Sequence, residues 1–219
     1  MYFSGTENTY TFVDIMSNGL SSDVVSTEVQ IKEQAKVLFF VRGNMTATCQ
    51  EIADFAGVKR TLVNYYFRSR ENLLRVAYQE IVCDMKRVLD EVYISDVSFE
   101  DKVERLIGCT MEFRLKYPFF EIFNISEISN KMQNKASIMQ PVPSPRLACF
   151  IREIEQEMAR GTIQPSNPHN FLLNLMSLIS YPITLKPLYA EVYGMTDEEY
   201  DEVLKERKAL IKKILFKKL

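Results

Sequence analysis

The chain has 219 residues, of which 47% are hydrophobic and 26% charged, and its formal net charge is −2. This length fits one large domain or two small ones, and the composition is typical of a folded protein with a hydrophobic core. The single histidine (His169) and the four scattered cysteines (Cys49, Cys83, Cys109 and Cys149) provide no zinc motif and no catalytic triad. We therefore expect no metal, no cofactor and no enzymatic activity.

The first 26 residues are polar, and they lack the basic start and continuous apolar core of a signal peptide. We interpret residues 1–26 as a polar tail of unknown role. No run of 18 apolar residues occurs anywhere in the chain, so no membrane span is expected.

Helical patterns begin at Thr27, where Ile31, Ala35, Leu38 and Phe39 share one helical face, and this helix ends at Gly43-Asn44. Next, Thr48-x-x-Glu51 is a capping box that opens a second helix, which ends at Gly57. A third helix is predicted over Lys59–Phe67, and Ser69 is expected to cap a long fourth helix.

Five further helices are predicted over residues 99–116, 118–132, 143–160, 168–191 and 196–217. Pro182 and Pro187 should kink or end the fourth of these, and the stretch 140–146 is a Pro-rich connection. No strand pattern competes with these helices. The predicted fold is therefore all-α with about nine helices, divided into a head over residues 27–74 and a larger body over residues 75–219.

Positive charge is concentrated in the head. Residues 28–75 hold eight Lys or Arg and five Asp or Glu, so they carry +3, and the rest of the chain carries −5. Two short helices joined at a tight glycine turn form a helix-turn-helix, whose second helix can enter a major groove. The same stretch supplies cations for phosphates and polar side chains for bases, so it predicts DNA binding.

The residue order "EIADFAGVKRTLVNYYFRSRENLL" resembles the DNA-binding domain of TetR-family transcriptional regulators. The resemblance covers residues 27–74, and the last two predicted helices also look like those of the family. It implies a dimeric regulator of the bacterial cytoplasm that binds a double-stranded DNA operator. The DNA-binding residues that it implies are Thr48, Gln50, Lys59, Arg60, Thr61, Asn64, Tyr65, Tyr66 and Arg70.

Three positions depart from the family pattern. Asn64 stands where most members have a phosphate-binding Tyr, Leu62 stands where Thr is frequent, and Lys59 takes a common Ser position. The operator sequence therefore does not carry over from relatives. Tyr65 and Tyr66 could also simply pack the small head, and Arg68 and Arg75 could be solvated.

In the resembling family the body encloses an effector cavity and its last two helices form the dimer. For an apolar or amphipathic effector, the expected pocket residues are Phe113, Tyr117, Phe120, Phe123, Phe150 and Met176. For a homodimer built as a four-helix bundle, the expected interface residues are Leu175, Leu178, Ile179, Leu204, Leu210, Ile211 and Ile214. Both sets could instead be ordinary core.

Two functions remain after the enzyme class is set aside. The first is a dimeric repressor that a small molecule releases from a palindromic operator. The second is a DNA-bound structural or protein-interaction factor of the same fold without a small-molecule effector. The acidic balance outside the head argues against a general DNA coat.

Overall fold

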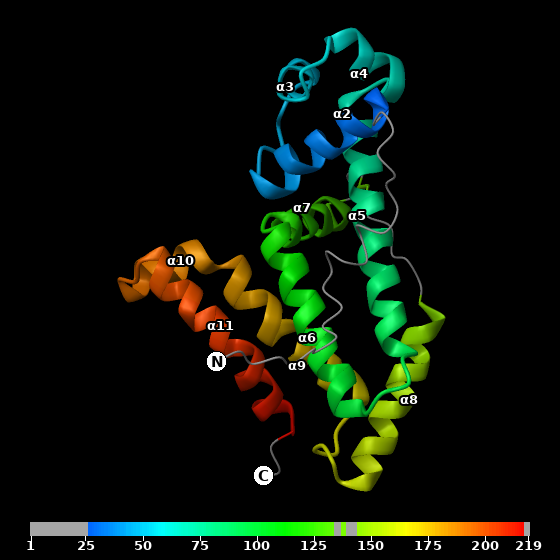
Figure 1. Cartoon of the computed structure of the whole chain (residues 1–219), viewed down its shortest axis with the longest axis vertical. Helices are drawn as coiled ribbons and strands as arrows, with labels where there is room; N and C mark the ends of the chain where they lie inside the picture. Colours follow the sequence, from blue (N-terminus) through cyan, green and yellow to red (C-terminus); the bar gives the residue numbers. More distant parts are fainter. Residues whose placement is uncertain (1–25, 134–136, 139–143, 217–219) are drawn as a thin grey trace, which may run out of the picture.

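The computed structural model of the chain describes residues 26–133, 137–138 and 144–216. In these ranges the chain forms ten α-helices and one π-helical turn, with no strand, which confirms the all-α prediction (Figure 1). The count exceeds the expected nine because the segment predicted as one helix over 168–191 forms two, α9 (Pro168–Thr184) and α10 (Lys186–Tyr193). Nearly all of the predicted polar tail, and most of the Pro-rich connection, lie outside the described residues.

The head consists of α2 (Thr27–Lys36), α3 (Cys49–Phe55) and α4 (Arg60–Phe67), which lie at one end of the molecule against the first half of α5 (Arg70–Tyr93) (Figure 1). The predicted caps are present. Thr48 and Glu51 form the capping box at the start of α3, and the Ser69 hydroxyl accepts the backbone N–H of Asn72 at the start of α5. These bonds satisfy backbone donors that a helix start leaves open.

The first predicted helix ends in a π-helical turn, η1 (Val37–Val41), which the sequence pattern did not indicate. Leu38, Phe39 and Phe40 are consecutive and all buried. A regular α-helix turns successive side chains by 100°, so three neighbours rarely share a narrow buried face, whereas the wider π turn spreads them over two packing surfaces. The result is that Phe39 packs in the head while Phe40 reaches the body.

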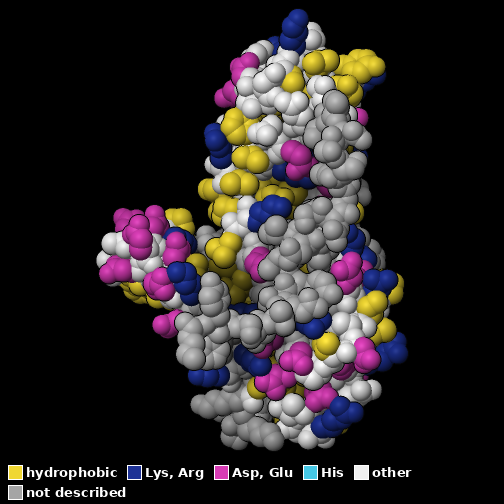
Figure 2. Space-filling view, viewed as in Figure 1, with side chains coloured by type: hydrophobic (Ala, Val, Ile, Leu, Met, Phe, Trp, Pro, Cys, Tyr) yellow, Lys and Arg dark blue, Asp and Glu magenta, His cyan; other side chains and the backbone are white. Residues whose placement is uncertain are grey.

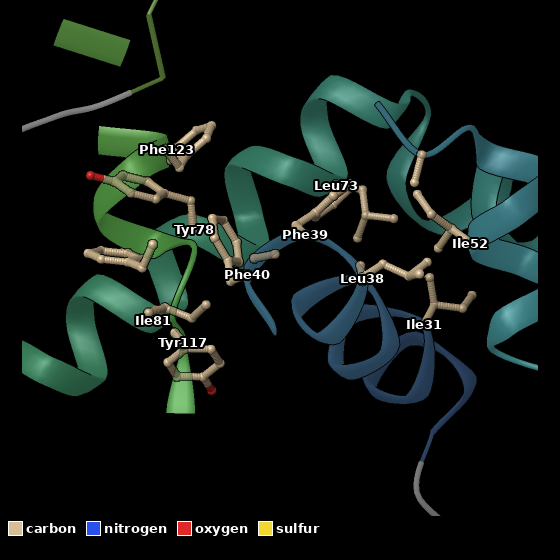
Figure 3. Close-up of a cluster of buried hydrophobic side chains, with 14 of the residues drawn as sticks. Ile31, Leu38, Phe39, Phe40, Ile52, Leu73, Tyr78, Ile81, Tyr117 and Phe123 are labelled. Carbon is tan, nitrogen blue, oxygen red and sulfur yellow. The ribbon is translucent and has the colours of Figure 1, made fainter. Parts of the chain in front are cut away.

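Phe40 joins the head to α7 (Phe120–Met132) (Figure 3). Its ring centroid lies 5.5 Å from that of Phe123, 6.0 Å from that of Phe120 and 6.4 Å from that of Tyr78. The Phe119 backbone N–H also donates to the Phe40 carbonyl at 3.1 Å. One continuous hydrophobic cluster therefore runs from Ile31 in the head to Phe123 in the body, across the predicted boundary at residue 74.

Gly43 makes this junction possible. Its backbone has φ +71°, and a Cβ at this position would lie 2.6 Å from the ring of Phe119. Only glycine combines this conformation with so close an approach. Gly43, which was expected to end the first helix, therefore also lets the head pack closely against Phe119, the residue before α7.

The remaining body helices are α6 (Phe99–Lys116), α8 (Pro145–Arg160) and α11 (Asp197–Phe216). They enclose a second hydrophobic cluster together with α9 and the end of α5. Buried aromatic rings stack through it: the Phe150 ring lies 5.1 Å from Tyr93 and 5.7 Å from Phe99. Ion pairs tie the helices at the margin, including Lys102 to Glu153 at 2.8 Å and Lys212 to Glu104 at 2.9 Å.

The apolar segment is interrupted at its two prolines, as predicted. Side chains of α11 donate hydrogen bonds to two backbone carbonyls of α9 that have no helical donor. Pro182 has no N–H, so the Leu178 carbonyl loses its helical donor, and Arg207 donates to it instead at 2.8 Å. The helix stops at Leu185, which leaves the Pro182 carbonyl open, and the Tyr200 hydroxyl donates to it at 2.9 Å. These two bonds pair α9 with α11.

One side of the apolar segment over α9 and α10 is exposed in the described chain. Leu173, Tyr181, Leu188 and Val192 all lie at the surface. Among the described residues no single helix is both long and apolar enough to cross a membrane. Only α9 and α10 taken together, bent by 68° at their junction, reach that length and composition.

Candidate nucleic-acid interface

The outer face of α4 gathers most of the predicted DNA-binding side chains. Val63 and Phe67 point into the head core, so the positions on the opposite face of the helix point outward. The exposed residues on and directly beside this helix are Lys59, Arg60, Thr61, Asn64, Tyr65, Tyr66 and Arg68. In the described part of the chain, no carboxylate lies within ion-pairing distance of Lys59, Arg60 or Arg68. This face therefore presents cations and hydrogen-bonding groups that are available to another molecule.

Tyr65 does not pack the head, which was the alternative interpretation of the pair, whereas Tyr66 is more covered and its ring lies 6.4 Å from that of Phe67. Tyr65 is 66% exposed and Tyr66 is 37% exposed. Their rings meet edge to face, with centroids 5.1 Å apart. Exposed aromatic rings beside cations are suited to contact with sugars, phosphates or thymine methyl groups.

The start of α3 places Thr48 and Gln50 at the surface of the same head. The Thr48 N–H donates to the Glu51 carboxylate at 2.7 Å, and the Thr48 hydroxyl accepts the Glu51 N–H. The bond from the Thr48 backbone, followed by that from its side chain, lowers the pKa of Glu51 below its ordinary value. The Gln50 amide donates to Asp54 at 2.7 Å. Both predicted residues are accessible, but each is held by a neighbouring acid.

Arg70 has an intramolecular role that the sequence did not indicate. It is half-buried, its Nε donates to the Ala47 carbonyl at 2.8 Å, and its guanidinium lies 5.7 Å from the centre of the Phe39 ring. These contacts fix the segment before α3 to the start of α5. Arg70 therefore positions Thr48 relative to α4.

A backbone conformation and a hydrogen bond also stabilise the helix-turn-helix. Gly57 adopts φ +65° in the turn after α3, as expected for a helix-ending glycine. The Gln30 side chain on α2 donates to the Ala56 carbonyl at 2.8 Å, next to that turn. The sequence pattern did not single out Gln30, because one polar residue on a half-buried helix gives no signal of its partner.

The head is also tied to α5 by ion pairs. Glu80 on α5 pairs with Lys32 and Lys36 on α2, each at 2.9 Å, and Lys36 is only 5% exposed. Burial alone would raise the pKa of the Glu80 carboxyl, but the ammonium groups of Lys32 and Lys36 outweigh burial and lower it. These pairs therefore fix α2 against the middle of α5.

The residues expected to form an effector pocket fall in two hydrophobic clusters of the described chain. Phe113, Tyr117, Phe120 and Phe123 pack on one another and on Phe40 in the first cluster. Phe150 and Met176 belong to the second cluster. The expected pocket residues are thus divided between two clusters, because the first half of α6, with Phe99 and Leu106, packs in the second cluster, whereas Phe113 near its end packs in the first. An open cavity of about 380 Å³ lies elsewhere, lined by Cys83, Lys86, Arg87, Asp90, Pro145 and Arg146.

The residues expected at a dimer interface also separate into two groups. Leu175, Ile179, Leu204 and Ile211 are buried within the single chain, where they join α9 and α11 to α6, so a partner cannot reach them. Leu210 and Ile214 are exposed, and Leu178 is partly exposed. The exposed apolar residues on this side that the sequence did not select are Leu173, Tyr181, Leu188, Val192, Tyr193 and Val203.

Residues 31–77 match the model of the family described as bacterial regulatory proteins, tetR family. The match runs from α2 into α5 and contains every residue of the predicted DNA-binding set. A curated relative, the HTH-type transcriptional regulator YhgD of Bacillus subtilis (strain 168), described as uncharacterized, is 24% identical over 139 residues, which are 63% of this chain and 72% of YhgD.

Solved structures extend the similarity to the whole fold. A TetR family transcription regulator from Marinobacter aquaeolei VT8 superposes with a TM-score of 0.55 at 14% identity, over 88% of this chain and 96% of that chain. A TetR-family transcriptional regulator from Haemophilus influenzae RD superposes with a TM-score of 0.50 at 14% identity, over 84% and 94%. At this identity the two superpositions establish the fold alone.

Proposed function

Because this chain is a DNA-binding transcriptional regulator with the head and fold of the TetR family, we propose that it is a dimeric repressor in the bacterial cytoplasm. In this proposal two heads bind a palindromic operator, and a small apolar or amphipathic molecule releases them. The observation that carries the proposal is the outer face of α4, where exposed cations, Asn64 and Tyr65 lie together on a rigid helix.

The dimer is supported by the exposed apolar side of α9, α10 and α11. Large apolar patches on a protein surface are typical of interaction sites. The helix α11 also begins with acids (Asp197, Glu198 and Glu199) and ends with Lys213 in its last turn. Two copies related by a two-fold axis can pair this helix antiparallel, so that the acidic start of one lies near the basic end of the other. Leu210 and Ile214 then contact the partner.

The two recognition helices of such a dimer would reach half-sites about 34–36 Å apart, one turn of DNA. The effector would act on the distance between the heads. The aromatic cluster of α6 and α7 supports this view, because Phe120 and Phe123 hold Phe40 of the head. A molecule that separates these rings would move the head relative to the body.

The test is to select bound DNA from a random pool at two salt concentrations, with the full chain. The expected result is a palindromic consensus whose half-sites are one turn apart, and affinity that falls steeply with salt. Small molecules are then screened for release of that DNA. Recovery of no consensus would overturn the repressor proposal. If the protein binds a consensus sequence, if no small molecule weakens that binding, and if a protein partner co-purifies, the structural or protein-interaction factor is favoured instead.

A further inference from the structure

The outer face of α7 carries an apolar stripe, which we define as Leu115 at the end of α6 with Ile122, Ile125, Ile128 and Met132 of α7. All five are exposed, Ile125 by 59% and Met132 by 80%. The four α7 residues follow one another at helical spacing on one side, opposite Phe120 and Phe123. A surface helix normally turns charged and polar residues outward. This helix does the reverse, and its outward residues between Ile122 and Ser129 are Ile and Ser only.

The acids that α7 does contain are turned inward. Glu121 pairs with Arg114 of α6, and Glu127 is buried, where it accepts the Ile138 N–H at 2.6 Å and the Ser137 hydroxyl at 2.8 Å. Both carboxylates of α7 are therefore bound by groups of the same chain, and the apolar stripe remains the solvent-exposed side of the helix. Burying such a stripe in a contact removes apolar area from water, which favours association.

The stripe adjoins the proposed dimer face. Arg114, next to Leu115, donates from its Nε to Ser180 of α9 at 3.1 Å, and Ser180 precedes the exposed Tyr181. Figure 2 shows hydrophobic side chains along the edge of the molecule between the head and the projecting α10–α11 arm, where Figure 1 places α7. The stripe and the exposed side of α9 and α10 therefore form neighbouring parts of one flank.

From these observations we infer that the outer face of α7 is a second contact with the partner copy of this chain, beside the α9–α11 contact. This inference rests on the proposed dimer. Its consequence follows from the inner face of the same helix, which holds Phe40 and so the head. Once the outer face is fixed by the partner, both heads are held at a set distance from the two-fold axis. The α9–α11 contact assembles the dimer, and the α7 contact sets the spacing of the half-sites.

The experiment compares Ile125→Glu with Gln156→Glu, which adds the same charge at an exposed position of α8. Sedimentation equilibrium gives the dimer dissociation constant, and binding is measured on the selected operator with the half-site spacing unchanged or lengthened by two base pairs. We expect Ile125→Glu to weaken the dimer about tenfold and to lose most of the discrimination between the two spacings. Gln156→Glu should match the parent.

Ile125→Ser, which removes the apolar contact without adding charge, should shift both measurements in the same direction and guards against misfolding of the first variant. If both Ile125 variants keep the parent's dimer constant and its spacing discrimination, the α7 contact is overturned while the dimer stands. If the parent itself sediments as a monomer at all concentrations, the proposed dimer fails, and the α7 contact fails with it.

Discussion

The outer face of α4 and the outer faces of α7, α9, α10 and α11 are all exposed, but their side chains differ in chemistry. The α4 face carries Lys59, Arg60, Asn64 and two tyrosines, whereas the other helices expose Ile, Leu, Val and Tyr side chains, which on α11 lie among charged residues. A polar partner such as DNA is recognised by hydrogen bonds and charge, and a second copy of a protein is recognised by apolar burial. This difference in surface chemistry is what the proposed function rests on, with DNA at the α4 face and a second copy of the chain at the apolar faces.

The largest effect is expected from a charge in the apolar face of α11. Leu210→Glu should weaken dimerisation by about 3 kcal/mol, roughly a hundredfold or more, because a carboxylate would be buried without a partner. Operator binding should fall with it. Sedimentation equilibrium measures the loss, and Gln156→Glu is the matched control. A dimer dissociation constant equal to that of the parent would show that this face of α11 is not part of the interface.

The α4 face is tested by Arg60→Ala, with Arg105→Ala on the exposed surface of α6 as its control. Loss of Arg60 should cost about 1–3 kcal/mol of operator binding and relax base preference at one position of each half-site. Competition binding against operators with single base changes measures both effects. Equal binding of all sequences by parent and variant would show that Arg60 contacts no base.

The junction between the two ends is tested by Glu80→Gln, which leaves the buried ammonium of Lys36 with one acid fewer. The free energy of unfolding should fall by about 1–3 kcal/mol, while the exposed Glu155→Gln on α8 should change little. Thermal and denaturant unfolding of both variants measures the loss. A loss no larger than that of the control would mean that the ion pairs are solvated surface contacts.

The ion pairs of Glu80 and Lys36 also predict that the stability of the fold falls at acid pH and again at strongly alkaline pH. The pKa of Glu80 is lowered from 4.5, so its contribution is complete above pH 4.5 and is lost as the pH falls through the lowered value. Burial would lower the pKa of Lys36, but Glu33 and Glu80 raise it above 10.5, so that contribution is lost only at a higher pH. Glu80→Gln should reduce the loss of stability on the acid side.

A smaller effect is expected from Arg70, which distinguishes a DNA contact from an internal clamp. Arg70→Ala should lower the free energy of unfolding by about 1–2 kcal/mol, because the Ala47 carbonyl loses its donor. Arg70→Lys keeps the charge but lacks the Nε–H that makes this bond. We expect it to retain the salt dependence of DNA binding and to lose stability. If Arg70→Lys had the same free energy of unfolding as the parent, the hydrogen bond from Arg70 Nε to the Ala47 carbonyl would not contribute to stability.

Local sequence determined much of the head. The capping box of Thr48 and Glu51, the cap at Ser69 and the glycine turn at Gly57 depend on neighbours within four residues, and each is present as predicted. The proline break near residue 185 is likewise local, since Pro187, in the first turn of α10, has no N–H with which to continue the hydrogen bonds of α9. Exposure of Tyr65 also follows from the helical period opposite Val63 and Phe67.

Contacts between distant residues required the tertiary structure. An apolar residue on an amphipathic helix can face its own core or a partner, and periodicity does not separate these, so Leu204 and Ile211 became core while Leu210 and Ile214 stayed outside. The same holds for Arg70 on Ala47 and for Arg207 on Leu178, where a long side chain finds a carbonyl 23 or 29 residues away. Sequence fixes which groups need partners, and the packing of helices decides which partners they meet.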